Sequence, residues 1–132
     1  MYDRVISSFS GDYAFLSNFW HKPVSVADVL YPTNEHAYQA SKTMIAEERD
    51  QFRSFALPPG VAKRLGRSVT LRDNWDGIRV KVMYEINVQK FSNPELRRLL
   101  LSTSGCELIE GNTWGDQFWG VCDGLGRNYL GK

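Results

Sequence analysis

The sequence contains few of the residues that build metal sites and disulfide frameworks. In 132 residues it has only two cysteines, Cys106 and Cys122, and two histidines, His21 and His36. The cysteines form no CxxC pair, and the imidazoles are too few and too poorly spaced to hold a zinc ion. We therefore predict reduced thiols, no catalytic transition metal and no cofactor. Carboxylate, lysine and aromatic side chains are left to carry any chemistry.

The chain also lacks long apolar runs and an excess of charge. No apolar stretch approaches the length needed to cross a bilayer, and no basic-then-apolar leader opens the sequence. The formal net charge of +1 gives no general attraction to a polyanion. A local basic cluster is nevertheless present at Lys63, Arg64, Arg67 and Arg72. We expect a cytoplasmic protein without a membrane partner, in which this cluster either contacts phosphate or is a solvated helix face.

A chain of this length is expected to form one domain over residues 1–132. Extended patterns predict strands at residues 4–9, 23–30 and 106–109. Apolar periodicity and the placing of proline and glycine predict helices from residue 34, within 45–57, within 59–66, at 75–91 and after Pro94. The helix at 75–91 is expected to be the central packing helix, with Arg79 away from its apolar face.

The most informative segment runs from Tyr31 to Lys42, where turn-forming residues precede a helix. Thr33 can cap the helix through its hydroxyl, and Glu35 lies where the helix dipole favours a negative charge. Residues three, four and seven apart share a helix face, so one stripe is formed by Glu35, Tyr38, Gln39 and Lys42. About 10.5 Å of axial rise separates the acid from the base, so both could reach a small reacting group. The alternative is that Glu35 only interacts with the helix dipole and that Lys42 is only a solvated base.

Two other segments have a composition typical of binding sites. Residues 13–20 are crowded with aromatic rings, among them Phe19, while Ser17 and Asn18 offer hydrogen bonds to a polar ligand. Residues 111–132 are rich in glycine and tryptophan, which place flat surfaces and close backbone approaches beside a carboxylate. The candidates there are Trp114, Asp116, Trp119 and Gly120. The alternative is a tail that wraps the core with aromatic plugs.

Several ordered segments resemble the YbiA-like, or NADAR, family. They include Phe-Ser-Gly-Asp-Tyr at residues 9–13, Leu-Ser-Asn-Phe at 16–19, Tyr-Pro-Thr-Asn-Glu-His-Ala-Tyr-Gln-Ala at 31–40 and Gly-Arg-Asn-Tyr-Leu-Gly at 126–131. The resemblance covers almost the whole chain. It implies a small α+β domain, mostly helical with a small β-sheet, and a pocket for ADP-ribose or a nucleotide ribose. It also implies cleavage of an N-glycosidic bond at a site that includes Glu35, Trp75 and Asp116, with Lys42 as the helix lysine.

Breaking an N-glycosidic bond builds positive charge on the ribose C1′, which a nearby carboxylate can stabilise. We expect Glu35 to stabilise this state or align water, with Asp116 assisting. Lys42 could instead attack C1′ and form an imine, if burial lowers its pKa. The tryptophans would stack on a base or cover the ribose, or else pack in the core. The predicted ligand-binding residues are Ser17, Asn18, Phe19, Tyr38, Gln39, Trp75, Trp114, Trp119, Gly120 and Asn128.

Three functions are compatible with these residues. The favoured one is a hydrolase that removes ADP-ribose from guanine in nucleic acid, since a flipped-out base needs only a small footprint. The second is an N-glycosidase acting on phosphoribosyl-amino-pyrimidine intermediates of riboflavin synthesis. The third is a non-catalytic module that binds ADP-ribose or NAD. The expected partner is an ADP-ribose-containing nucleotide or ADP-ribosylated nucleic acid, and no particular oligomeric state is predicted.

Overall fold

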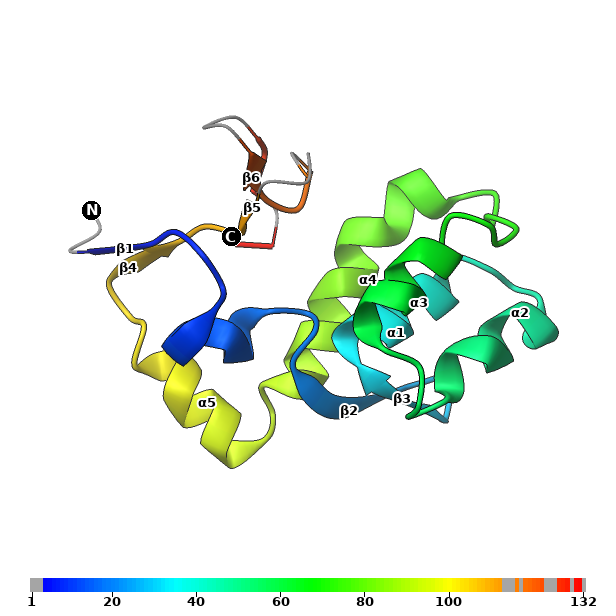
Figure 1. Cartoon of the computed structure of the whole chain (residues 1–132), viewed down its shortest axis with the longest axis horizontal. Coiled ribbons are helices and arrows are strands. Elements are labelled where there is room, and N and C mark those ends of the chain that lie inside the picture. The colour runs from blue at the N-terminus through cyan, green and yellow to red at the C-terminus, as the bar shows by residue number, and fades with distance from the viewer. Residues whose placement is uncertain (1–3, 113–115, 117, 123–125, 129, 132) are drawn as a thin grey trace. The chain divides into compact units, whose positions relative to one another are not determined.

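The computed structural model describes residues 4–112, 116, 118–122, 126–128, 130 and 131 (Figure 1). The chain divides into two units. The helix-rich unit is Asn18–Asn93, and the terminal unit combines Met1–Ser17 with Pro94–Lys132. Both contain helices and short strands, so the predicted α+β class is confirmed. One domain over residues 1–132 stays a prediction.

The helix-rich unit begins with an antiparallel hairpin of β2 (His21–Val26) and β3 (Val29–Thr33). The sequence predicted a single extended segment over residues 23–30, and that prediction is wrong at its centre. The chain reverses at Ala27 and Asp28, whose φ angles are 51° and 63°. Positive φ at both central residues is the requirement of a type I′ turn, which asparagine and glycine usually satisfy. Aspartate tolerates a positive φ, but alanine rarely adopts one, so the residue types at these positions do not predict the turn.

The rest of this unit is helical. Its elements are α1 (Asn34–Ser41), α2 (Ala46–Asp50), the 3-10 helix η2 (Gln51–Arg53), α3 (Pro59–Leu65) and α4 (Trp75–Lys90). These match the predicted helices closely. The central place, however, belongs to α1, which packs against the hairpin and against α2, η2, α3 and α4. The sequence assigned that place to residues 75–91 because only that segment has a long apolar periodicity.

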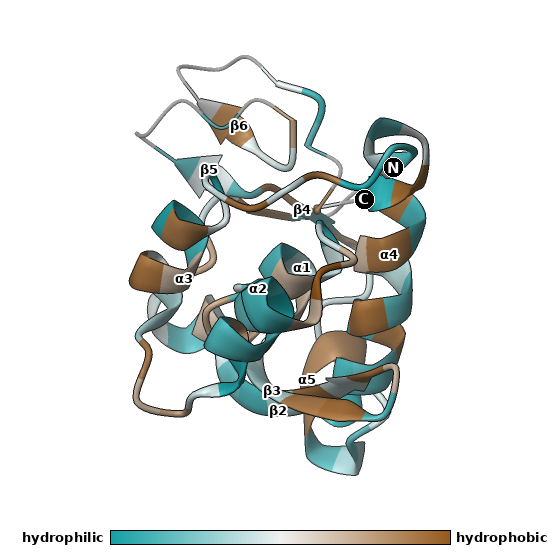
Figure 2. Ribbon diagram, turned by 90° about the vertical axis from the view of Figure 1, so that its right-hand side faces the viewer, coloured by the Kyte–Doolittle hydropathy of each residue, from teal (hydrophilic) through white to brown (hydrophobic). Residues whose placement is uncertain are grey.

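Helix α4 is amphipathic, as its sequence predicts. Trp75, Met83 and Ile86 are buried, whereas Val80 and Tyr84 are exposed. Figure 2 shows the resulting alternation of apolar and polar bands along the helix. The buried side supports α1, which is how the fold fixes the helix that carries Glu35, Tyr38 and Gln39 and ends at Lys42.

The terminal unit contains short elements. They are β1 (Arg4–Ile6), the 3-10 helix η1 (Gly11–Leu16), α5 (Pro94–Leu101), β4 (Cys106–Leu108), β5 (Gly111–Asn112) and β6 (Val121–Cys122). Strand β1 pairs in parallel with β4, and β5 pairs in parallel with β6. The predicted aromatic loop therefore starts inside a 3-10 helix, where Phe15 and Leu16 are buried.

Cys106 is a buried free thiol, and the side chain of Cys122 lies outside the described residues, so the reduced state of the two cysteines stays a prediction. None of the helices in the described part of the chain has the length and apolar character needed to cross a membrane.

Candidate functional site

Helix α1 is polar in sequence and yet buried on every side. All eight residues from Asn34 to Ser41 are buried, and only 5% of Glu35 and 4% of Gln39 is exposed. Carboxylate and amide side chains are seldom enclosed to this degree, because losing water costs free energy unless a partner replaces it. The small residues Ala37, Ala40 and Ser41 are enclosed, and so are Glu35, Tyr38 and Gln39 of the polar stripe. A buried polar stripe is typical of a functional site.

The start of α1 is fixed by hydrogen bonds. The Thr33 hydroxyl accepts from the backbone N–H of His36 at 3.3 Å, which confirms the predicted cap. The Asn18 carbonyl accepts from the backbone N–H of Glu35 at 3.0 Å, and the Asn34 side-chain amide donates to Asn18 Oδ1 at 3.3 Å. The structure therefore brings Asn18, a predicted ligand-binding residue, to the same helix end as Glu35.

The predicted stripe is brought together with Trp75. Gln39 Nε2 donates to Glu35 Oε1 at 3.2 Å. The ammonium of Lys42 lies 5.6 Å from the centre of the Tyr38 ring, within cation–π range. The Tyr38 and Trp75 rings are 5.2 Å apart between centroids and tilted by 56°. An acid, an amide, a base and two aromatic rings thus follow one another along a single buried surface.

Lys42 lies in an environment that disfavours its charge. Burial is the main cause that lowers the pKa of its ammonium, and the charge of Glu35 opposes this by raising it. The cations of Arg67, Arg79 and Lys63 lower the pKa further. A larger share of Lys42 is therefore the free amine, the form that can attack carbon.

Arg79 was not predicted as a site residue, and the expectation that it points away from the packed face is wrong. It is half-buried, and its charge acts on Lys42. The available signal was its spacing from Trp75: four residues along α4 place both side chains on one helix face.

Gly66 lies directly against Gln39. A Cβ atom added to Gly66 would be 1.8 Å from Gln39 Oε1, so this position requires glycine for close approach. Among the residues that the structure describes, no donor reaches Gln39 Oε1 within hydrogen-bond distance. Unsatisfied buried acceptors are uncommon in folded proteins, and this one is enclosed against Gly66.

His36 has a structural part in this unit. Its Nε2 lies 2.7 Å from the Leu57 carbonyl oxygen, and its Nδ1 lies 2.7 Å from Thr33 Oγ1. A carbonyl only accepts, so Nε2 carries the proton and Nδ1 accepts from the hydroxyl. Burial lowers the pKa of His36, which keeps the ring neutral.

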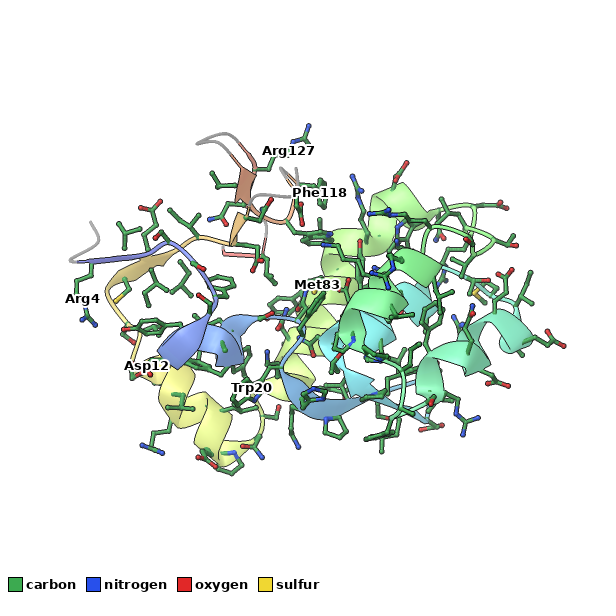
Figure 3. All side chains as sticks on the ribbon, in the orientation of Figure 1. Arg4, Asp12, Trp20, Met83, Phe118 and Arg127 are labelled. Carbon is green, nitrogen blue, oxygen red and sulfur yellow. The ribbon has the colours of Figure 1, made fainter. Side chains whose placement is uncertain are left out.

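The candidates in the terminal unit are held by their own backbone contacts. Asp116 Oδ1 accepts from the N–H groups of Phe118 at 3.2 Å and Trp119 at 3.0 Å. Asn128 Nδ2 donates to the Leu108 carbonyl at 2.8 Å. Figure 3 shows Arg127 beside Phe118, with the guanidinium carbon 6.0 Å from the ring centre. These contacts fix the conformation of the chain after residue 108. They do not test the expected roles of Asp116, Trp119 and Asn128 in the site, which stay predictions.

Other predicted residues are placed only within their own units. Ser17 closes η1 through its N–H to the Ala14 carbonyl, and Phe19 is 40% exposed, with its ring edge facing Gly60. Gly120 approaches the Glu110 carbonyl so closely that a Cβ atom would be 2.0 Å away. Trp114 lies outside the described residues. The approach of Asp116 to Glu35 stays a prediction.

Within the described ranges, no three histidine, cysteine, aspartate or glutamate side chains are grouped so that they could hold a metal ion. The chemistry of the buried stripe is that of a carboxylate, an amine and aromatic rings.

Comparison with known proteins gives a consistent result. A family model described as the NADAR domain matches residues 7–132. The N-glycosidase YbiA of Escherichia coli (strain K12) is 39% identical over 137 residues, which cover 99% of this chain and 84% of that protein. The NMR structure of Escherichia coli YbiA matches with a TM-score of 0.85, covering 99% of this chain and 80% of that chain. A riboflavin biosynthesis protein of Vibrio vulnificus is 37% identical over 125 residues, covering 92% of this chain and 34% of that protein.

Proposed function

This chain belongs to the NADAR domain family, and we propose that the N-glycosyl bond it hydrolyses joins the ribose of ADP-ribose to a guanine base. The observation that carries the proposal is the buried stripe, in which Glu35 and Lys42 share one face of α1. The cations that surround Lys42 suit a substrate with a diphosphate, because guanidinium groups bind phosphate oxygens strongly. The neighbouring Tyr38 and Trp75 rings suit a flat base or the apolar face of a ribose.

Two routes are open to this pair. In direct hydrolysis, Glu35 stabilises the positive charge that develops on C1′ and orients the attacking water. In the imine route, Lys42 Nζ bonds to C1′ while the base leaves with the electron pair of the broken bond and takes up a proton. The ribose ring then opens to an imine, and water hydrolyses the imine to free ADP-ribose and the amine. We favour the imine route because cations and burial both lower the pKa of Lys42.

A second candidate substrate is a phosphoribosyl-amino-pyrimidine. Its support is the similarity to a riboflavin biosynthesis protein of Vibrio vulnificus. This substrate carries one phosphate ester, so it would use fewer of the cations near Lys42. A non-catalytic ADP-ribose or NAD module is the third candidate, and it predicts binding without turnover.

The deciding experiment offers the candidates in parallel. The protein is incubated separately with DNA carrying ADP-ribosylated guanine, with the phosphoribosyl-amino-pyrimidine and with NAD, and released sugar is detected by mass spectrometry. We expect release from the first substrate, and loss of at least about a hundredfold in rate for Glu35→Gln, which keeps the shape but removes the charge. Release from the second substrate alone, or binding without release, would overturn the proposal.

Borohydride distinguishes the two routes. Reduction during turnover should trap a covalent sugar adduct in the native protein and in Lys81→Ala, which lacks an exposed lysine of α4. The adduct should be absent in Lys42→Ala. Turnover without any adduct in the native protein would favour direct hydrolysis.

A further inference from the structure

The carboxylate of Glu48 joins two segments that border Lys42. Its Oε1 accepts from Thr43 Oγ1 at 2.7 Å and from the Thr70 backbone N–H at 2.8 Å. Its Oε2 accepts from Thr70 Oγ1 at 3.0 Å. Thr43 directly follows Lys42, whereas Thr70 lies in the loop of residues 66–74 between α3 and α4. One side chain therefore ties the end of α1 to this loop.

The backbone at the end of α1 is held by further bonds from the same neighbours. The Arg72 backbone N–H donates to the Lys42 carbonyl at 2.8 Å. Arg49 Nε donates to the Thr43 carbonyl at 2.6 Å. The two carbonyl groups that follow α1 are thus both engaged, so displacement of the loop would disturb the backbone from which the Lys42 side chain extends.

The loop also carries charge that acts on Lys42. Arg67 lies in it, directly after the glycine that contacts Gln39, and its cation lowers the pKa of the Lys42 ammonium. Arg67 itself is exposed, so its position depends on how the loop is held. The Glu48 bonds to Thr70 are three residues further along the same loop.

We propose that Glu48 is a positioning residue for the N-glycosidase reaction, which fixes the loop of residues 66–74 against α1 and thereby sets the place of Lys42 and Arg67. The inference rests on the proposed role of Lys42 in the reaction. Glu48 acts through geometry and not through its charge, because Glu35 is the carboxylate that raises the pKa of Lys42. Hydrogen bonds from Thr43 and Thr70 lower the pKa of Glu48, so the carboxylate stays ionised and able to accept all three bonds at neutral pH.

Four single variants, together with one double variant, test the geometry. Glu48→Ala removes the connection, whereas the amide of Glu48→Gln can accept from Thr43 and the Thr70 N–H and donate to Thr70 Oγ1. Thr70→Val removes one of the bonds at an exposed residue, so it keeps the test valid if Glu48→Ala fails to fold. Glu47→Ala is the matched control, since Glu47 is an exposed glutamate next to Glu48 on α2.

Two measurements are made on each variant. The first is the determination of kcat and KM as separate values for the substrate that the native protein cleaves. The second is the pH at which Lys42 becomes half-reactive toward acetic anhydride, followed by mass spectrometry of the labelled peptide. The labelling needs no substrate, so it tests the positioning role even if the proposed substrate is wrong.

We expect Glu48→Ala to lower kcat about tenfold, as small misplacements of reacting groups do, and to move the Lys42 labelling midpoint up toward the ordinary value. Thr70→Val should show a smaller change in the same direction, and Glu48→Gln should retain most of the native behaviour. The double variant Glu48→Ala/Thr70→Val should be no worse than Glu48→Ala, because both break one connection. The inference would be overturned if the pH midpoint of Lys42 labelling is unchanged in Glu48→Ala. It would also be overturned if Glu48→Gln and Glu48→Ala lower kcat to the same extent.

Discussion

At the scale of single residues, the structure gives Lys42 neighbours of both charge signs. Glu35 favours its ammonium, whereas burial and the cations of Arg67, Arg79 and Lys63 favour its amine. The balance lowers the pKa from its ordinary value of 10.5. Such a balance is typical of a lysine that must lose its proton to react.

Removing an anionic neighbour and removing a cationic neighbour should move the pKa of Lys42 in opposite directions. Glu35→Gln removes the favourable charge and should lower it further, and Arg67→Ala removes an unfavourable one and should raise it. The measurement is the pH dependence of Lys42 acetylation in each variant. Arg53→Ala is the control, because Arg53 forms an exposed pair with Asp50 and should leave the midpoint unchanged. Shifts of the same sign in both variants would contradict this electrostatic account.

His36 makes the stability of the protein depend on pH. Burial lowers its pKa below the ordinary 6.5, so below that pH the unfolded chain binds a proton that the folded chain does not. The stability from this residue is therefore present above 6.5 and is lost as the pH falls through the lower folded value. Urea unfolding between about pH 8 and pH 5.5 should show a declining free energy of unfolding.

The control for this pH dependence is the second histidine. His36→Gln should lose about 1–3 kcal/mol at neutral pH, since Thr33 and Leu57 lose a well-placed partner, and its stability should vary less over the same pH range. His21→Gln, at an exposed position of β2, should change the native pH profile much less than His36→Gln, since the charge of His21 is the smallest of the causes that shift the pKa of His36. A native slope in His36→Gln would assign the effect to another group.

At the scale of elements, close packing of α3 on α1 depends on one glycine. Gly66 has φ −60°, an ordinary helical value, so alanine would be acceptable to the backbone. The obstacle is the Gln39 side chain, which a Cβ atom would overlap. Gly66→Ala should therefore destabilise the protein by about 1–3 kcal/mol and lower activity by displacing Gln39 from Glu35.

Gly77 offers a matched control for this substitution. It lies in the first turn of α4, and a Cβ atom there would meet nothing within 4 Å. Gly77→Ala should stabilise the protein by up to about 1 kcal/mol, because alanine loses less backbone entropy in a helix. Thermal unfolding and kcat/KM of both variants provide the comparison. A stabilised, fully active Gly66→Ala would show that Gln39 can move without consequence.

The elements that the sequence predicted well are those with strong local signals. Residues 75–91 were expected to be a helix, and α4 covers Trp75–Lys90, because its apolar residues recur with the helical period. The proline and glycine residues around α3 marked both of its ends. The hairpin turn at Ala27 and Asp28 escaped prediction because its left-handed backbone is imposed by the pairing of β2 with β3.

The candidate site was predictable to a similar extent. Spacing alone placed Glu35, Tyr38, Gln39 and Lys42 on one face, and the structure has them in contact along that face. Spacing could not show that the face is buried, because burial depends on what packs against α1 from distant parts of the chain. For the same reason Arg79 and Gly66 escaped notice: their effects on Lys42 and Gln39 arise only when α3 and α4 meet α1.

At the scale of the whole molecule, charge limits how nucleic acid can bind. The net charge is +1, and the cations that act on Lys42 are few. Binding of an ADP-ribosylated oligonucleotide to the inactive Glu35→Gln variant should therefore depend weakly on salt, with a slope of log Kd against log salt of about 1 to 3. Titrations between about 50 and 200 mM salt measure this slope.

The salt slope also separates the modes of recognition. A mononucleotide carrying the same ADP-ribose group should give nearly the same slope if only the diphosphate is held by the protein. A slope several times larger for the oligonucleotide would contradict local recognition and would indicate an extended contact with its backbone.

The complete enclosure of α1 has a consequence for how this protein tolerates mutation. A library of variants selected only for cellular abundance ordinarily shows which positions form the core. A library selected for turnover ordinarily shows a different set, the positions of the reactive groups. At Glu35 and Gln39 the two maps should coincide, because these proposed site residues are also enclosed in the interior. Improving catalysis there by directed evolution would thus require compensating changes elsewhere in the chain.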